Sequence, residues 1–536
     1  MAAAGDVLLA PELLFFFYKS RRFQPAWILP GGLSPEVQEL IGAVREAEAD
    51  GLTPSDYHLQ TITDMAQSVG KKIKKRKPFE PEAAADFDLL LTDAFLTYAA
   101  YLAHGKVDGE TLQVAWQGSC IDENLARLLD ESLAAGRVRE TLQSLPPQHP
   151  FYSNLKQALA QWRELDRRAK WTVFPGGPPL KKGDQGGKAR RLRERLLFLG
   201  DLGRDMRRPK DVFDGALEDA VRSLQSRYGL EATGVVDPPT RAALDRPPRD
   251  SVQQIAINLE RWRWMPHELG RRFIYVNIAN FELEVYENGR RLMAMKVVAG
   301  MEGWPTPDFS GRMTHVVVNP YWTVPIPVLL KELVNYIVKD RCYLENNKMV
   351  LLRNEDQGEV EIDPASVDWA KLDEKNLNFL VRQAPGPLNV LGRLKFVFPN
   401  KYGIFLHDTP YQADFAKTTR AFSHGCVRAE RPVELAAYVL RGRRGWDERS
   451  ILEAIDANIE RTVKLVEPLD IIFLYCTAWP DERGVMQFRP DVYERDRKLI
   501  EALGQAPPRP GDFSARHRAE AAFLAILEKL RRAMNH

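Results

Sequence analysis

The chain has 536 residues, of which 44% are hydrophobic and 28% are charged, so its composition is that of a globular protein with more than one core. Its 75 basic and 73 acidic side chains nearly cancel, and the formal net charge of +2 gives no global electrostatic signal for nucleic acid. The four cysteines form no CxxC pair, and no segment reaches the roughly 18 uninterrupted apolar residues of a membrane span, which argues against a zinc knot and a membrane-spanning helix.

The N-terminal region is predicted to be mostly helical. Residues 34–51 and 86–105 place apolar side chains at helical spacing, and each segment stops at a glycine. The start of the chain does not look like a signal peptide, because it lacks an early basic region and Pro11 interrupts its apolar run. We therefore expect either a cytoplasmic protein or a mature form whose export signal has been removed. Residues 174–188 are rich in proline and glycine and are predicted to be a linker.

A small helical unit follows this linker. Residues 192–202 form one amphipathic segment, and the stretch AVRSLQSRYGLEATGVVDPPTRAAL follows it. Its first helix is predicted to bury an apolar face made of Ala220, Val221, Leu224 and Tyr228. Gly234 and Asp237 mark a turn before a last short helix. The stretch resembles the three-helix peptidoglycan-binding domain; the alternatives are an ordinary helical hairpin, or a relative that has lost its glycan groove and acts as a spacer.

The second half of the chain is predicted to be rich in strands. Residues 272–300 alternate apolar and polar side chains on both sides of Asn288-Gly289, which is a hairpin signature. Residues 335–385 are polar and are interpreted as an irregular insertion over the sheet. Further strands are predicted within residues 315–325, 394–408 and 470–479, and further helices within residues 251–266, 324–334, 431–442, 448–457 and 511–536.

The stretch FLHDTPYQADFAKTTRAFSHGCVRAERP, residues 405–432, concentrates two of the nine histidines and one of the four cysteines. His407 ends a predicted strand, and Cys426 follows 19 positions later. A cysteine becomes nucleophilic when a nearby base or a positive field populates its thiolate. A strand and its return loop would bring the imidazole beside the sulfur. His407 can then take the thiol proton and later return it to a leaving amine.

The tight turn at residues 423–426 offers backbone amides for an oxyanion hole. Gly425 permits a backbone angle that is forbidden to other residues and lets a substrate carbonyl approach closely. Arg428 can offer a fork to a carboxylate or steady the loop.

Two other interpretations of this chemistry were weighed. A lone cysteine is more often a small buried hydrophobic residue, which is how Cys342 and Cys476 are interpreted. A zinc site made of His407, His424 and Cys426 would need a fourth ligand or a catalytic carboxylate, and their spacing matches no zinc signature.

The stretch HDTPYQADFAKTTRAFSHGCVR resembles the catalytic signature of the L,D-transpeptidases, in which a histidine is followed after a spacer by Ser/Thr-His-Gly-Cys. The opening FFFYKSRRFQPAWI resembles the start of the scaffold domain in the large members of this family. Other stretches that resemble the large members are NLERWRWMP, NPYWTVPIPVL, RQAPGPLNVLGRLKFVFPN and QFRPDVY. The resemblance therefore spans nearly the whole chain.

This resemblance implies an α+β multidomain architecture. We expect a helical N-terminal scaffold, a small three-helix peptidoglycan-binding-like domain, and a β-rich L,D-transpeptidase catalytic domain with a capping insertion. The expected boundaries are 1–180 for the scaffold domain, 181–247 for the peptidoglycan-binding-like domain, 248–270 for a scaffold return helix, 271–490 for the catalytic domain with its capping insertion at about 330–386, and 491–536 for a C-terminal helical tail.

The resemblance also implies roles for individual residues. Cys426 would be the nucleophile and His407 its base, while Ser423, His424 and Gly425 would shape the turn and the oxyanion hole. Arg428 stands where many smaller members carry asparagine, and Phe405 stands where some relatives carry tyrosine. Tyr321 and Trp322 are equally compatible with plain core aromatics. The residues expected to contact substrate are Arg428, Tyr321, Trp322, Phe405 and Asn389.

The implied reaction is an acyl transfer in two steps. Cys426 attacks the amide after the third residue of a peptidoglycan stem tetrapeptide, D-alanine leaves, and an amine on a second stem resolves the thioester into a 3→3 cross-link. No metal or organic cofactor is expected, carbapenem β-lactams are expected to acylate the same sulfur, and the implied location is the periplasm or cell envelope.

Two rival functions stay open. One is a cysteine L,D-carboxypeptidase or amidase that hydrolyses stem peptides or protein–peptidoglycan links. The other is a non-catalytic wall-binding protein that relies on residues 190–246. The intact pair of His407 and Cys426 argues against this second rival.

Overall fold

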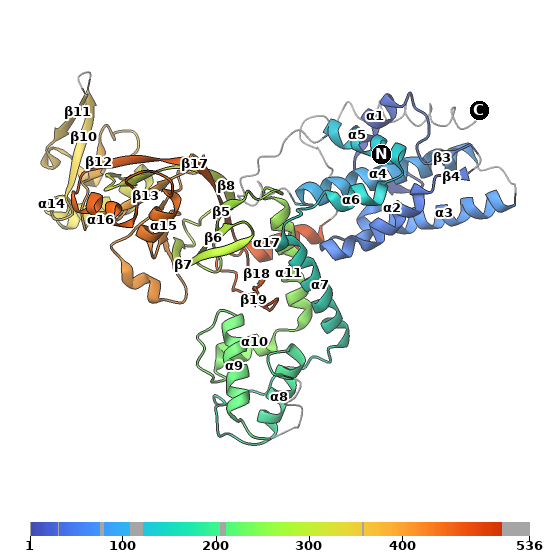
Figure 1. The fold of residues 1–536 in the computed structure, drawn as a ribbon, viewed down its shortest axis with the longest axis horizontal. Coiled ribbons are helices and arrows are strands. Elements are labelled where there is room, and N and C mark those ends of the chain that lie inside the picture. The colour runs from blue at the N-terminus through green and yellow to red at the C-terminus, as the bar shows by residue number, and fades with distance from the viewer. Residues whose placement is uncertain are drawn as a thin grey trace. The chain divides into compact units, whose positions relative to one another are not determined.

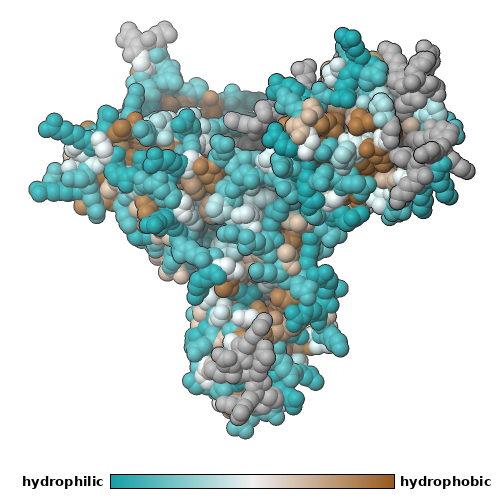
Figure 2. Space-filling model, turned by 45° about the vertical axis from the view of Figure 1, so that its right-hand side comes forward, coloured by the Kyte–Doolittle hydropathy of each residue, from teal (hydrophilic) through white to brown (hydrophobic). Residues whose placement is uncertain are grey.

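The computed structural model describes residues 2–30, 32–75, 80–107, 122–203, 211–355 and 358–505 (Figure 1). The helix expected within residues 511–536 lies outside these ranges. The chain divides into two compact units, one made of Met1–Glu268 with Cys476–His536 and one made of Leu269–Tyr475. Figure 2 shows a largely hydrophilic surface with small separate hydrophobic patches. Within the described ranges, no helix combines the length and the hydrophobicity that crossing a bilayer requires.

The N-terminal part of the first unit is a helical core around α4 (Pro81–His104). Asp88 and Asp93 are buried on α4, and their carboxylates accept hydrogen bonds from the backbone N–H groups of Trp27 at 2.9 Å and Ala10 at 2.8 Å. These bonds satisfy the buried charges and hold distant segments against α4. The α-helices that contact α4 include α1 (Pro11–Ser20), α2 (Glu36–Arg45), α3 (Leu59–Lys74), α5 (Asp122–Ala135) and α6 (Val138–Ser144).

The helix stops expected from the sequence are confirmed at both predicted glycines. The segment that begins with α2 ends in a 3-10 turn at Asp50, and Gly51 follows it with φ of 73°. Helix α4 ends at His104, and Gly105 follows it with φ of 87°. Both angles lie in the region that favours glycine, which is why the helices end there.

The rest of the first unit is built on α7 (Pro150–Arg168) and α11 (Pro248–Arg263), which pack against each other. Between them in the chain lie three shorter helices, α8 (Gly187–Leu199), α9 (Gly215–Arg227) and α10 (Pro238–Asp245) (Figure 1). The apolar face predicted for α9 and its end is confirmed, because Ala220, Val221, Leu224 and Tyr228 are buried. The unit is completed by the strands β18 (Ala478–Pro480) and β19 (Met486–Phe488) and by α17 (Arg495–Gly504).

The second unit is built on a nine-stranded sheet in the order β15-β7-β16-β14-β13-β8-β17-β5-β6, and an additional pairing of β7 with β6 closes it into a ring. The predicted hairpin joins β6 to β7, with φ of 51° at Asn288 and 74° at Gly289. The strands are β5 (Arg272–Asn277), β6 (Glu282–Glu287), β7 (Arg290–Gly300), β8 (Phe309–Val318), β13 (Leu394–Val397), β14 (Leu406–His407), β15 (Ala421–Ser423), β16 (Val427–Ala429) and β17 (Arg461–Leu474). Helices α15 (Pro432–Val439) and α16 (Glu448–Asp456) pack against each other.

A second, smaller sheet lies between β8 and β13 in the chain, and we call residues 322–383 the cap. Its strands, in the order β11-β10-β12-β9, are β9 (Trp322–Thr323), β10 (Met349–Glu355), β11 (Gly358–Ile362) and β12 (Leu380–Gln383). The prediction of irregular structure for 335–385 is therefore wrong. The cap's apolar residues alternate with polar ones over only a few positions, and many charged residues surround them. Met349, Leu351 and Val381 are nevertheless buried in a separate hydrophobic core of the cap.

The helix predicted within residues 324–334 is present in three pieces. These are α12 (Ile326–Val328), a π-helical turn η5 (Leu329–Leu333) and α13 (Val334–Lys339). A π-helical turn is rare and often marks a functional position, because the extra residue redirects the side chains of that turn.

Candidate active site

The adjacent parallel strands β14 and β16 bring the predicted histidine and cysteine to neighbouring positions. His407 pairs with Arg428, Leu406 pairs with Val427, and Cys426 immediately precedes β16. The backbone N–H of Val427 donates to the carbonyl oxygen of Phe405 at 2.9 Å, which extends the pairing to the position of the cysteine. Because side chains alternate along a strand, Cys426 and Arg428 project on the face of the sheet that carries His407.

His407 is buried, and its imidazole is neutral. Its Nδ1 lies 2.5 Å from the carbonyl oxygen of Asp408, which only accepts, so the neutral ring carries its proton on Nδ1 and keeps a lone pair on Nε2. Burial lowers the pKa of His407 to about 3, and the positive charges of Arg428 and Lys395 act in the same direction. The backbone carbonyl groups of Asp408 and Leu391 act against them. The ring is therefore neutral at pH 7, the form that takes up a proton.

The Cys426 thiol is half-buried, and its Sγ lies 4.0 Å from the carbonyl oxygen of Gly403. Burial raises the pKa of Cys426, while the backbone N–H of Phe405 and the charges of Lys395 and Arg428 act in the opposite direction. The thiol at rest is therefore neutral, and so is the imidazole on the neighbouring strand. A neutral thiol becomes a nucleophile only when a base removes its proton.

Hydrogen bonds from Ser423 and Thr306 hold the turn before Cys426 in place. Ser423 Oγ donates to the carbonyl oxygen of Cys426 at 2.5 Å and accepts from the N–H of Gly425 at 3.1 Å. Thr306 Oγ1 donates to the carbonyl oxygen of Gly425 at 2.8 Å. Gly425 has φ of 102°, and a Cβ there would lie 2.9 Å from Ile404 Cδ1, so the turn requires glycine as expected. Because the Gly425 amide already donates to Ser423, the Cys426 amide remains the candidate oxyanion donor.

The cap reaches this turn through its π-helical segment. Nε2 of His424 lies 2.5 Å from Oε1 of Glu332, and its ring meets that of Trp304 edge-on with 5.5 Å between centroids. Lys331 Nζ lies 4.9 Å from the centroid of the Trp304 ring. The sequence did not point to Glu332, because the hydrogen bond joins residues 92 positions apart and no local pattern records it.

Two cations shape the charge at the site, and one of them was not predicted. Lys395 lies on β13 opposite His407, with Nζ 3.7 Å from the centroid of the Phe405 ring. Burial lowers the pKa of Lys395, and Cys426 acts against it. Arg428 Nη1 lies 3.5 Å from Asp414 Oδ2, and its buried Nε has no hydrogen-bond partner in the part of the chain that the structure describes. Lys395 lies in the stretch RQAPGPLNVLGRLKFVFPN, but nothing in that stretch assigns it a role, so only the pairing of β13 with β14 reveals its place beside His407.

The other residues expected to contact substrate have different surroundings. Tyr321 is 47% exposed, and its N–H donates to Glu460 Oε1 at 3.0 Å. Trp322 lies on β9 and packs against the core of the cap, which favours the interpretation as a core aromatic. Phe405 is half-buried beneath Lys395 and also supplies the backbone N–H that acts on the Cys426 thiol.

The prediction that Asn389 contacts substrate is corrected. Its side chain is 1% exposed, and Nδ2 donates to the carbonyl oxygens of Pro320 at 2.9 Å and Ala384 at 3.0 Å. Its Oδ1 accepts from the N–H of Leu391 at 2.9 Å. With both ends of the amide engaged inside the protein, Asn389 holds the connection between β12 and β13 in place.

The residues of the zinc alternative are not arranged as a ligand set. His424 Nε2 is engaged by Glu332, and His407 Nδ1 by the carbonyl oxygen of Asp408. Among the described residues, no group of three or more His, Cys, Asp and Glu side chains is placed to hold a metal ion. The positive charges of Lys395 and Arg428 near Cys426 would also repel a metal cation.

Comparison with known families defines the class of this site. Residues 271–446 match the model of the YkuD family, described as "L,D-transpeptidase catalytic domain". Residues 12–159 match a "Scaffold domain", and residues 185–244 match a "Putative peptidoglycan binding domain". The chain therefore carries an L,D-transpeptidase catalytic domain of the YkuD family. It combines this domain with a scaffold domain and a peptidoglycan-binding domain, which confirms the family resemblance and the α+β multidomain fold.

The individual relatives cover only parts of the chain. A "Putative L,D-transpeptidase" of Haemophilus influenzae is 33% identical over 247 residues, which are 46% of this chain and 49% of that protein. The chain thus spans about half the length of the curated relative it matches. A crystal structure of the L,D-transpeptidase (residues 123–326) from Xylanimonas cellulosilytica covers 56% of this chain and 98% of its own, at 15% identity. Its TM-score of 0.16 is too low for the two folds to be compared.

Proposed function

We propose that the protein is an L,D-transpeptidase that links peptidoglycan stem peptides through a thioester on Cys426. One observation carries the proposal. A neutral His407 with a lone pair on Nε2 occupies the strand next to Cys426, within residues that match the L,D-transpeptidase catalytic domain. The peptidoglycan-binding domain in the same chain supports peptidoglycan as the substrate, and the periplasm or cell envelope as the location.

In the first step, Cys426 Sγ attacks the carbonyl carbon of the third residue of a stem tetrapeptide, while His407 Nε2 takes the thiol proton. The Cys426 amide faces the negative charge that develops on the carbonyl oxygen. The C–N bond to the terminal D-alanine then breaks, and the proton passes from Nε2 to the departing amine. A thioester remains on the sulfur.

In the second step, an amine of another stem attacks the thioester carbonyl and His407 Nε2 takes the proton that the amine loses. The C–S bond breaks, the sulfur recovers the proton, and a 3→3 cross-link is released. Arg428, whose buried Nε has no partner among the described residues, is the candidate to bind a stem carboxylate. Carbapenems would acylate the same sulfur through opening of the β-lactam ring.

The cap supports transfer to an amine over hydrolysis. Glu332 contacts His424 in the turn that carries the nucleophile, so the cap touches this edge of the site. A covered site limits the access of water to a thioester and leaves the acceptor amine as the better-placed nucleophile.

The test is incubation of the purified protein with disaccharide-tetrapeptide, followed by mass spectrometry. Dimers that lack one D-alanine are the expected product, and Cys426→Ala and His407→Gln are expected to abolish them. Tripeptide monomers without dimers would make the enzyme an L,D-carboxypeptidase. Full cross-linking by Cys426→Ala would refute the assignment of the nucleophile.

A further inference from the structure

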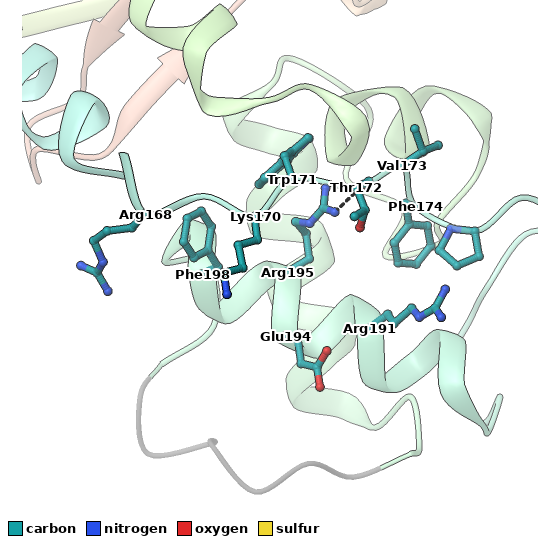
Figure 3. A pocket seen from close by; sticks show the side chains of 11 residues that line it. Arg168, Lys170, Trp171, Thr172, Val173, Phe174, Arg191, Glu194, Arg195 and Phe198 are labelled. Atoms are coloured by element: carbon teal, nitrogen blue, oxygen red, sulfur yellow. Dashed lines mark hydrogen bonds between the residues drawn. The ribbon is translucent and has the colours of Figure 1, made fainter. Parts of the chain in front are cut away.

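A pocket in the first unit contains a half-buried cation, Arg195, that is already engaged within the protein (Figure 3). Its Nη1 and Nη2 donate to the carbonyl oxygens of Leu244 at 2.5 Å and Thr172 at 2.6 Å. Its guanidinium covers the Trp171 ring, with 3.7 Å between the guanidinium carbon and the ring centroid, and the charge of Asp245 acts on it. Little of its charge or hydrogen-bonding capacity is left for a ligand.

Lys395 in the second unit is a half-buried cation of the opposite kind. Its Nζ lies 3.7 Å from the centroid of the Phe405 ring, and no hydrogen bond or ion pair holds it among the residues that the structure describes. Glu460 acts on this charge from a distance, and its carboxylate already accepts from the backbone N–H of Tyr321 at 3.0 Å. The N–H donors of an ammonium need acceptors, and an aromatic ring offers only its face. Lys395 therefore keeps both charge and hydrogen-bonding capacity for an anion.

Lys395 and Arg428 flank His407 in one row across the sheet. His407 pairs with Arg428 of β16 on one side and with Lys395 of β13 on the other. Paired residues of neighbouring strands point to the same face, and neighbouring strands are about 4.8 Å apart. The two cations therefore lie on either side of the imidazole, each one strand away. The ammonium of Lys395 lies over Phe405 and also acts on the Cys426 thiol.

The leaving group of the proposed reaction carries an anion at a fixed distance from the base. In the first step the nitrogen of the terminal D-alanine takes its proton from His407 Nε2, so this nitrogen lies within hydrogen-bond distance of the imidazole. The carboxyl carbon of the same D-alanine is two bonds away, about 2.5 Å from the nitrogen. The carboxylate therefore falls within reach of the side chains that flank His407. A carboxylate without a partner in a half-buried site is costly, which calls for one of the two cations.

Lys395 is the better of the two partners for this carboxylate. Arg428 Nη1 lies 3.5 Å from Asp414 Oδ2, which offsets part of its charge. Its guanidinium carbon also lies 5.5 Å from the centroid of the Tyr411 ring. Lys395 has no such acidic partner among the described residues, and an ammonium is a compact charge whose donors rotate to meet an anion that enters and leaves in each turnover. Arg428 stays the candidate for a different stem carboxylate.

We propose that Lys395 determines the specificity of the acyl-transfer site by binding the α-carboxylate of the amine that leaves or attacks. In the first step this is the carboxylate of the terminal D-alanine. In the second step the acceptor amine takes the place that the D-alanine amine has left, so an acceptor with its own α-carboxylate is bound in the same way. Water has no carboxylate, and Lys395 therefore favours transfer over hydrolysis. The proposal rests on the proposed function, because it takes the thioester on Cys426 as the intermediate.

The first test compares two donors that differ in one charge, disaccharide-tetrapeptide with a free C-terminal carboxylate and the same molecule with a C-terminal amide. The measured quantity is kcat/KM for the release of D-alanine or D-alaninamide. The wild type is expected to prefer the carboxylate, and Lys395→Met to lower this preference at least about tenfold, as the loss of a charge-assisted hydrogen bond does. A change in the thiol pKa slows both donors by the same factor and cancels in the ratio.

Three further variants make this comparison specific. Lys395→Arg keeps the charge and is expected to keep most of the preference. Lys464→Met is the control, because Lys464 is exposed on β17 of the same sheet, and it is expected to keep the wild-type preference. Loss of the preference in Arg428→Met but not in Lys395→Met would assign the carboxylate to Arg428 and overturn the proposal. Thermal unfolding checks the fold of each variant. A wild type that does not distinguish the two donors also overturns the proposal, whatever the variants do.

The second test concerns the acceptor. The thioester formed from disaccharide-tetrapeptide is offered labelled D-alanine, D-alaninamide or ethylamine at equal concentrations of the free amine. The wild type is expected to incorporate D-alanine most efficiently. Lys395→Met is expected to lose this preference and to release more tripeptide by hydrolysis. The same division between exchange and hydrolysis in both proteins would refute a role of Lys395 in the second step.

The two proposals fail separately. Absence of any D-alanine release by the wild type would count against the proposed function itself. Release of D-alanine and D-alaninamide at equal kcat/KM would leave the assignment of Cys426 intact and would refute the role of Lys395 alone.

Discussion

Lys395 is the cation whose effect on the Cys426 thiol follows most directly from the structure. It lies on β13, and β14 and β16 follow in the sheet, so two strand spacings of together about 10 Å separate it from the strand of Cys426. At an effective dielectric constant of about 20, a unit charge at this distance is worth about 1.7 kcal/mol, and one Debye length of screening reduces this to about 0.6 kcal/mol. Lys395→Met is therefore expected to raise the thiol pKa of Cys426.

The sign of this effect is open to direct measurement. Burial already raises the thiol pKa, and Lys395 and Arg428 lower it, so the loss of either charge reduces the thiolate fraction at neutral pH. Burial also lowers the pKa of Lys395, so its titration approaches that of the thiol and the two groups titrate together.

The assay is the rate of alkylation of Cys426 by iodoacetamide as a function of pH. The rate is measured on the peptide that contains Cys426 by mass spectrometry, because the exposed Cys342 is alkylated too. The wild-type rate is expected to keep rising through pH 9, and the curve of Lys395→Met to lie at higher pH. Lys464→Met is the matched control, since Lys464 is an exposed lysine on β17 of the same sheet. Superimposable curves for Lys395→Met and the wild type would refute the electrostatic reasoning.

The remaining predictions concern the turn, the cap and the base. Gly425→Ala places a side chain at a φ of 102° and against Ile404, which costs about 1–3 kcal/mol. The rate of acylation by tetrapeptide is expected to fall more than tenfold. Adding Ile404→Val to the same chain is expected to restore only part of that rate, because it relieves the contact and not the backbone strain. Glu332→Gln weakens a part-exposed contact with His424 that is worth at most about 1 kcal/mol, so kcat/KM for acylation is expected to fall up to fivefold. Glu345→Gln in the cap is the control and is expected to leave it unchanged. Because the pKa of His407 is lowered to about 3, the acylation rate is expected to stay level as the pH falls through 6.5, the ordinary histidine pKa. A fall in the acylation rate with its midpoint near pH 6.5 would contradict the assignment of a neutral buried base.

Several features of the site were accessible from the sequence because their signals are local. The Ser423 to Cys426 turn needs a residue with positive φ, and a glycine stands at that position. The hairpin at Asn288-Gly289 and the helix ends at Gly51 and Gly105 follow from the same preference, which acts within a few residues. The family signature that joins His407 to Cys426 added the nucleophile and its base as predictions.

Other features were missed or misjudged because they depend on contacts between distant segments. Asn389 looks like any polar loop residue, yet its amide is fully engaged by the backbone on both sides. The cap was taken as irregular because its few buried residues, such as Leu351 and Val381, stand among charged ones. Its strands are stabilised by pairing with one another, and no single strand carries that signal.

The sequence by itself determined which side chains are chemically capable: a thiol, an imidazole and a glycine turn, together with the helical and strand-rich halves that carry them. Only the tertiary structure decided their state. The pairing of β13, β14 and β16 sets Lys395 and Arg428 near the thiol, and burial keeps the His407 imidazole neutral. The physical reason is that pKa values and hydrogen-bond partners depend on distance and desolvation in space, which a linear order of residues does not specify.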